Sequence, residues 1–121
     1  MEQQHFERLV IEALDSLPRQ FKERLENVEL VVESEPGPTQ LLEAGLEEGA
    51  DLLGLYEGVP LTERGAHYGL VLPDKISIFK RPIEDSCRND EEIRSLVSRV
   101  VRHEIAHFFG LDDQRLEELG R

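Results

Sequence analysis

The sequence lacks several features that would tie it to a membrane or to the outside of a cell. Its 121 residues contain no tryptophan and one cysteine, Cys87, so no disulfide can form within the chain. No apolar run approaches the ~20 residues that a membrane-spanning helix needs. The first ten residues, MEQQHFERLV, carry neither the basic segment nor the apolar core of a secretory signal. We therefore expect a cytoplasmic protein without a membrane partner.

Positive charge is also scarce. Acidic residues outnumber basic ones by 26 to 14, which gives a formal net charge of −12. Such a protein is repelled by phosphate backbones, so the composition argues against a nucleic-acid partner. The length is typical of one domain that can fold without disulfides or a structural metal. We expect one domain over residues 1–121, with a monomer as the default state.

The first third of the chain has the pattern of two helices followed by a strand. Apolar residues recur at helical spacing between residues 6 and 17, and the pattern stops at Pro18. Proline is tolerated in the first turn of a helix, so Pro18 is expected to begin a second, short helix that carries Phe21 and Leu25. The β-branched segment 28–34 (VELVVES) predicts a strand.

The middle of the chain is expected to hold two further strands and two loops. Residues 35–51 are rich in glycine, proline and acids, which predicts a loop with at most one helical turn around residues 39–47. Residues 52–60 form an apolar segment that predicts a strand, and residues 62–68 predict a loop. Residues 74–80 alternate polar and apolar side chains, which indicates a strand with one exposed face.

The last third predicts one long helix with marked ends. Asn89 or Asp90 can cap its first turn, and Gly110 suits the left-handed conformation that ends many helices. On a helical wheel one broad arc is apolar and holds Ile93, Leu96, Val97, Val100 and Phe108. The opposite arc holds Ser95, Ser98, Arg99, Arg102 and Ala106. The apolar arc also receives three ionisable residues, His103, Glu104 and His107, and burying them costs free energy unless something satisfies them.

The spacing of these three residues, H-E-x-x-H, indicates what satisfies them. Histidines four residues apart lie on one face of a helix, so His103 and His107 can bind one Zn²⁺ ion. Glu104 lies beside them, within reach of a water on that ion. Zinc lowers the pKa of its water toward ~7, and a neighbouring carboxylate takes the proton as the nucleophile forms. The sequence therefore predicts a zinc site with Glu104 as the general base.

A third protein ligand is expected just after the helix, because a site of two histidines alone is weak. Gly110 lets the chain turn sharply, and the string H-E-x-x-H-x-x-G-x-x-D places Asp113 where the returning chain presents a ligand. Asp112 and Glu117 are the alternatives. The competing interpretation is structural: both histidines are core residues satisfied by Glu104.

At these residues the chain resembles the zincin metallopeptidases, and more narrowly the small bacterial members of the minimal zincin group. The likeness extends over most of the sequence. It covers residues 10–18, 27–28, 53–58 and 72–79, and the H-E-I-A-H-F-F-G-L-D-D segment that begins at residue 103. Only this last segment is specific for a mechanism.

The resemblance implies an α+β, minimal zincin-like fold. A small mixed sheet packs against an N-terminal helix and a C-terminal active-site helix, which crosses beneath an edge strand. In zincins that strand commonly binds extended peptide substrate by main-chain pairing, and residues 76–79 or 53–57 are the candidates for it. The implied activity is zinc-dependent hydrolysis of a peptide or protein substrate.

The resemblance also assigns roles residue by residue. His103 and His107 bind zinc, Glu104 is the general base, and Asp113 is the third protein ligand. The chain differs from other zincins in two ways. The only methionine is Met1, so the Met-turn of metzincins is absent, and the chain after the motif is too short for the distant glutamate ligand of the thermolysin type.

Two other functions compete with peptide hydrolysis. The first is a zinc-binding module that docks a partner protein and has little or no hydrolytic activity. The second is a metal-dependent endoribonuclease, because a family of these uses H-G-x-x-H-x-x-G-Y-D-H. That family has glycine in place of Glu104 and histidine in place of Asp113, so the glutamate and the net charge both argue against RNA. Tyr56 and Tyr68 are candidates to stabilise an oxyanion, although a structural role is favoured for each.

Overall fold

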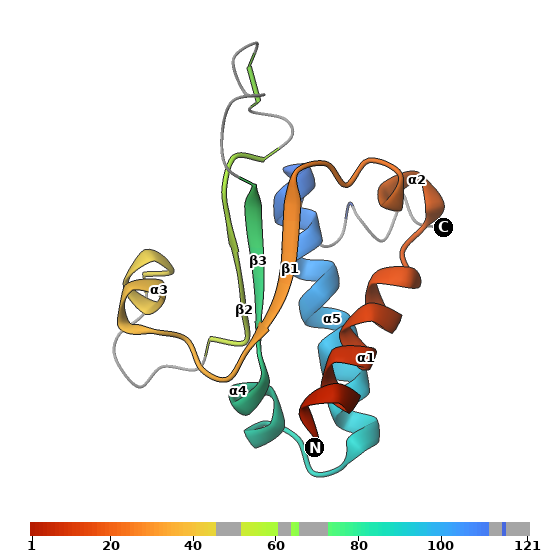
Figure 1. The fold of residues 1–121 in the computed structure, drawn as a ribbon, viewed down its shortest axis with the longest axis vertical. Helices are drawn as coiled ribbons and strands as arrows, with labels where there is room; N and C mark the ends of the chain where they lie inside the picture. Colours follow the sequence, from red (N-terminus) through yellow and green to blue (C-terminus); the bar gives the residue numbers. More distant parts are fainter. Residues whose placement is uncertain (46–51, 61–63, 66–72, 112–114, 116–121) are drawn as a thin grey trace.

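The computed structural model describes residues 1–45, 52–60, 64–65, 73–111 and 115. Within these residues the chain forms helices and a three-stranded sheet in an α+β arrangement (Figure 1). The helices are α1 (Gln3–Asp15), α2 (Arg19–Lys22), α3 (Pro38–Glu43), α4 (Lys80–Asp85) and α5 (Asp90–Phe109). The strands are β1 (Val28–Glu33), β2 (Gly54–Glu57) and β3 (Asp74–Phe79). This arrangement confirms the fold predicted from the sequence, including the small mixed sheet and the two packed helices.

The sheet has the strand order β1-β3-β2, so the last strand in the sequence is the central one. β1 pairs with β3 in parallel, and β2 pairs with β3 antiparallel. The proposal that residues 76–79 form an edge strand is therefore wrong, and of the two candidates only β2 lies at an edge. The central position also corrects the predicted exposed face of β3: Ile76, Ser77, Ile78 and Phe79 are all completely buried.

The N-terminal helix packs against α5 (Figure 1). It buries Phe6, Leu9, Val10 and Ala13, which lie on one face at helical spacing as the sequence pattern predicted. Pro18 occupies the N-cap position of α2, just before the first turn in which it was expected. α2 turns Phe21 into the core but ends at Lys22, before Leu25. The Phe21 ring meets the Phe109 ring edge-on, with centroids 5.1 Å apart, so this short helix closes the core at the far end of α5.

The structure contains two further short helices, one expected from the sequence and one not. α3 supplies the helical turn expected within residues 35–51, and Pro38 begins it. α4 was not anticipated, because its segment KRPIED is short and contains a proline. It follows β3 directly, and its Ile83 is completely buried. In the part of the chain that the structure covers, no helix has the length and apolar character to cross a membrane.

The long helix α5 begins and ends where the sequence predicted. The side chain of Asn89 accepts a hydrogen bond of 2.9 Å from the backbone N–H of Glu92, which satisfies one of the free donors of the first turn. At the other end Gly110 has φ 72° and ψ 28°, the left-handed conformation that glycine adopts without strain. α5 contacts α1, β2, β3 and α4, so it is the element that organises the fold.

Candidate metal centre

The last two turns of α5 bring His103, Glu104 and His107 together. Each offers one ligand atom, and the three atoms lie within 4.8 Å of one another. The imidazole rings of the two histidines are tilted by 58° to each other, with centroids 4.4 Å apart. This is the convergence that four-residue spacing on a helix predicts. The geometry therefore contains the donor cluster expected from the H-E-x-x-H motif.

The three side chains differ sharply in burial, and this corrects the helical-wheel interpretation. The side chains of His103 and His107 are 47% and 49% exposed, whereas that of Glu104 is 6% exposed. The histidines thus lie at the border of the buried arc and are open to solvent. The free-energy cost of burying an ionisable group therefore applies mainly to Glu104. Ala106, placed on the solvent side by the wheel, is completely buried. A wheel cannot show this, because it does not contain the elements that pack around the end of α5.

Glu104 lies beneath both imidazoles. Its Oε1 atom is 3.6 Å from Nδ1 of His107, and its Oε2 atom is 3.9 Å from Nε2 of His103. Each carboxylate oxygen thus faces one of the histidines. The carboxylate is therefore the buried member of the donor cluster, close to one ring nitrogen of each histidine.

Gly54 allows β2 to lie directly against this turn of α5. A Cβ atom at position 54 would be 2.6 Å from Cγ1 of Val100 and 3.2 Å from Cγ of Glu104. The first distance is shorter than any normal carbon contact, so a side chain here would push the strand away from the helix. Gly54 is a part of the site that the H-E-x-x-H motif does not predict. Its only signal was a glycine inside a strand pattern, which often marks a close approach of backbone.

The donor set fits a transition metal such as zinc. Imidazole nitrogen is a preferred zinc ligand, with bonds of about 2.0–2.1 Å, and one ion can join nitrogens that are about 4 Å apart or closer. The half-exposed rings leave space for an ion on the solvent side. The expected third ligand, Asp113, and the alternatives Asp112 and Glu117 lie outside the described residues.

A cavity of about 370 Å³ opens beside His103 and Glu104, between α5 and the segment that leads into β2. Its lining residues are Leu52, Leu53, Gly54, Leu96, Arg99, Val100, His103 and Glu104. Leu52 and Leu53 precede the edge strand and Gly54 begins it, and the others come from the turns of α5 that lead up to and include His103 and Glu104. The cavity is therefore continuous with the candidate metal centre.

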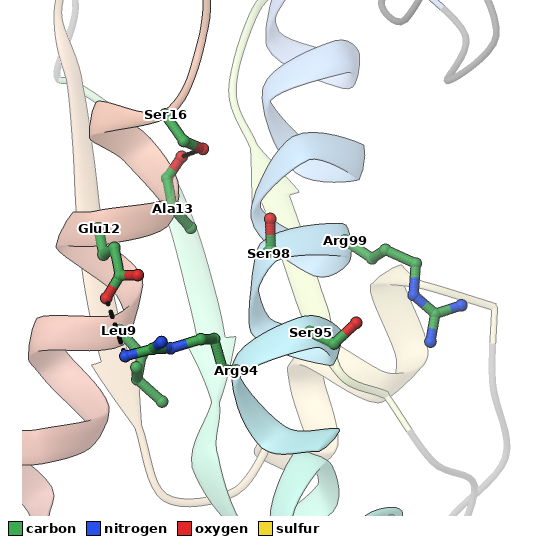
Figure 2. Close-up of a pocket in the computed structure, with 8 residues that line it drawn as sticks. All are labelled: Leu9, Glu12, Ala13, Ser16, Arg94, Ser95, Ser98 and Arg99. Carbon is green, nitrogen blue, oxygen red and sulfur yellow. Dashed lines mark hydrogen bonds and ion pairs between the residues drawn. The ribbon is translucent and has the colours of Figure 1, made fainter. Parts of the chain in front are cut away.

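A second groove lies on the side of α5 that faces α1. It measures about 350 Å³ and contains the ion pair of Glu12 with Arg94, whose charged atoms are 3.5 Å apart (Figure 2). Arg99 borders both hollows, and Figure 2 shows its guanidinium group pointing away from α1. Neither His103 nor His107 lines this groove, so it is separate from the metal centre.

A buried network supports the edge strand at its other end. The Tyr56 hydroxyl donates a hydrogen bond to Asp74, which is 3% exposed. Arg64 donates to the same carboxylate at 2.8 Å and lies over the ring of Phe108, 5.0 Å from its centroid. The structural role favoured for Tyr56 agrees with these contacts. Tyr68 lies outside the described residues.

Comparisons with known proteins agree with this geometry. The sequence profile of a family described as zincin-like metallopeptidase matches residues 25–121. No curated protein matches the sequence significantly. Among solved structures, a conserved hypothetical protein from Thermus thermophilus is similar with a TM-score of 0.57 and 23% identity. The match covers 98% of this chain and 96% of the other. At this level of identity the likeness concerns the fold.

Proposed function

The chain belongs to the zincin-like metallopeptidase family, and from this premise we propose that it hydrolyses peptide bonds with a zinc ion held by His103 and His107. We assign Asp113 as the third protein ligand, as the sequence motif indicates, and Glu104 as the general base. The observation that carries the proposal is the buried carboxylate of Glu104 beneath two half-exposed imidazoles.

When bound, zinc would polarise a water molecule and the substrate carbonyl, which lowers the barrier to hydrolysis. The protein's own groups then have distinct tasks. The two imidazoles are held in place by the backbone of α5, one turn apart. Glu104 takes the proton of the attacking water and passes it to the leaving amine, as a general base that becomes a general acid. Its burial would restrict the movement of this carboxylate, which is 6% exposed, and hold it near both imidazoles.

The edge strand β2 is the proposed support for the substrate. It pairs with β3 along one side, and its residues lie against the turn of α5 that holds Glu104. An extended peptide that paired with the outer side of β2 would pass over the histidine pair, with its scissile bond near the metal. The net charge of −12 disfavours the alternative of an RNA substrate, because it opposes approach of a phosphate backbone.

Two substitutions at the site test this proposal. Glu104→Gln removes the base and keeps the shape of the side chain, so it should retain zinc but lower peptide hydrolysis by about 10²–10⁴-fold. His103→Ala removes one ligand and should lower the zinc content of the purified protein. The measurements are elemental analysis of the metal and mass spectrometry of a random peptide mixture after incubation.

Glu91→Gln is the matched control, since Glu91 is an exposed residue in the first turn of the same helix. It should bind zinc and cleave peptides like the unmodified protein. Cleavage by the Glu104→Gln protein at the normal rate would reject the assigned mechanism. Zinc at full stoichiometry without cleavage of any peptide by the unmodified protein would favour the partner-docking module.

A further inference from the structure

The last turn of α5 carries a buried aromatic ring directly beside a candidate metal ligand. Phe108 follows His107 in the helix, and its side chain is completely buried, whereas that of His107 is 49% exposed. The direction of a helical side chain is set by the backbone that carries it, and the two residues share one peptide bond. A contact that fixes the Phe108 ring therefore also restricts the position of the His107 imidazole.

The end of a helix needs support from outside it. The last four carbonyl groups have no partner within the helix, and helix ends open more readily than helix centres. At the end of α5 the backbone N–H of Gly110 donates to the carbonyl of His107 at 3.0 Å, and that of Leu111 donates to Ala106 at 2.8 Å. The side-chain contacts of Phe108 add to these two backbone hydrogen bonds.

Two side chains from distant segments contact the Phe108 ring. The ring of Tyr56, on β2, meets it edge-on, with centroids 6.1 Å apart. The guanidinium group of Arg64 lies over it, 5.0 Å from its centroid. Edge-on ring pairs and cations over a ring face are both attractive. Phe108 is therefore held by one group from the edge strand and one from the segment that follows this strand.

Asp74 fixes both of these groups. Its carboxylate, which is 3% exposed, accepts a hydrogen bond from the Tyr56 hydroxyl and another, of 2.8 Å, from Nη2 of Arg64. It also accepts a hydrogen bond of 3.2 Å from the backbone N–H of Val59. Hydrogen bonds to a charged group are stronger than neutral ones, and burial strengthens them further. Tyr56, Asp74 and Arg64 thus form one connected unit, the Asp74 network.

Arg64 is the most constrained member of the Asp74 network. Its side chain is 7% exposed, and it also donates to the carbonyl oxygens of Val59 at 2.9 Å and of Glu26 at 3.1 Å. The guanidinium group is planar and carries its donors in a fixed arrangement, so these acceptors set the orientation of its face. A lysine ammonium could pair with Asp74, but it has no planar group to lay over the Phe108 ring.

We propose that the Asp74 network positions the metal ligand His107, because it holds Phe108 and with it the last turn of α5. Its three members are positioning residues, outside the donor cluster of the H-E-x-x-H motif. The inference rests on the proposed function, since it concerns the metal centre of the same site. It links the edge strand to the metal centre through a single buried ring.

Two conservative variants test the proposal through metal affinity. Tyr56→Phe removes the hydroxyl that binds Asp74 and keeps a ring beside Phe108. Arg64→Lys keeps a positive charge beside Asp74 and removes the planar group over the ring. Each should weaken zinc binding by about tenfold or more, as changes in the groups that support metal ligands commonly do. The measurement is competition with a chromogenic chelator, at a temperature at which circular dichroism shows each variant to be folded.

A second measurement does not depend on the metal. In the zinc-free protein, amide hydrogen exchange at residues 105–109 should be several-fold faster in both variants, because the last turn of α5 opens more often. A purely global loss of stability would instead accelerate exchange at residues 97–101, in the middle of the same helix, at least as much. The ratio between the two segments therefore separates positioning from general destabilisation.

Ile93→Val is the matched control for lost stability. Ile93 is buried near the start of α5, fourteen residues before His107 and about 21 Å away along the helix. The loss of one methylene group should lower the melting temperature, since it leaves a small void in the core. It should leave zinc affinity and the exchange at residues 105–109 unchanged, because it does not touch the Asp74 network.

The outcomes separate this inference from the proposed function. Unchanged zinc affinity in either network variant, or an equal loss in Ile93→Val, would overturn the inference and leave the peptidase intact. Unchanged exchange at residues 105–109 in the network variants would overturn it as well. Faster exchange there, in a protein whose unmodified form binds no zinc, would support the hold on the His107 turn and contradict the proposed function.

Discussion

Substitution of Arg64 by alanine should destabilise the protein strongly, because it breaks a buried ion pair. Arg64 and Asp74 lie 2.8 Å apart, and their side chains are 7% and 3% exposed. Arg64 also donates to the carbonyl oxygens of Val59 at 2.9 Å and of Glu26 at 3.1 Å. Arg64→Ala would leave the Asp74 carboxylate buried without its cationic partner. Breaking a buried pair in this way costs about 3–5 kcal/mol.

This loss is large for a domain of this size. Small domains have unfolding free energies of about 5–15 kcal/mol, and for about 120 residues each kcal/mol lowers the melting temperature by about 4 °C. We therefore expect a decrease of roughly 12–20 °C for Arg64→Ala, measured by calorimetry or by circular dichroism during heating.

The exposed ion pair of Arg19 with Glu23 provides the control. Its atoms are 2.7 Å apart, but the two side chains are 88% and 61% exposed, so Arg19→Ala should cost less than about 0.5 kcal/mol. The double variant Arg64→Ala with Asp74→Asn should recover part of the loss, because it removes the unpaired charge. An equal, small effect of Arg64→Ala and Arg19→Ala would refute the reasoning.

Two further predictions concern pH and helix capping. The hydrogen bond from Lys75 holds the pKa of Glu33 below its ordinary value of 4.5, so this stabilisation is complete above that value and is lost as the pH falls through the lower pKa of the folded state. Urea unfolding between about pH 6 and pH 3 should therefore show a smaller loss of stability for Glu33→Gln than for the unmodified protein; equal slopes would contradict the assignment. Asn89→Ala should lower the free energy of unfolding by about 1 kcal/mol, since it removes the N-cap of α5, whereas Asn89→Ser should retain most of it.

The parts of the fold that the sequence predicted well depend on near neighbours in the chain. α1 was identified from apolar residues at helical spacing, and α5 from a capping side chain, Asn89, and a terminal glycine, Gly110. The cluster of His103, Glu104 and His107 was also predictable from near neighbours in the chain, because residues three or four apart on a helix are neighbours whatever surrounds them. Local geometry alone was enough to place these groups together.

The errors arose where distant segments meet. Alternation in residues 74–80 predicted an exposed face, but β3 is paired on both edges and its Ser77 is completely buried. The same central position excludes it as the strand that receives a substrate. The wheel placed Ala106 in solvent, although it is completely buried in the hydrophobic core.

The sequence by itself determined that the donor atoms of His103, Glu104 and His107 lie together, because their spacing on one helix fixes their mutual positions. Tertiary structure alone decided what surrounds them. It placed β2 at the edge and Gly54 against Val100 and Glu104, and it left the histidines open to solvent while it buried the carboxylate. Contacts between segments that lie far apart in the sequence produced these features. No local pattern encodes such contacts, since they depend on how the sheet and the helix pack as whole elements.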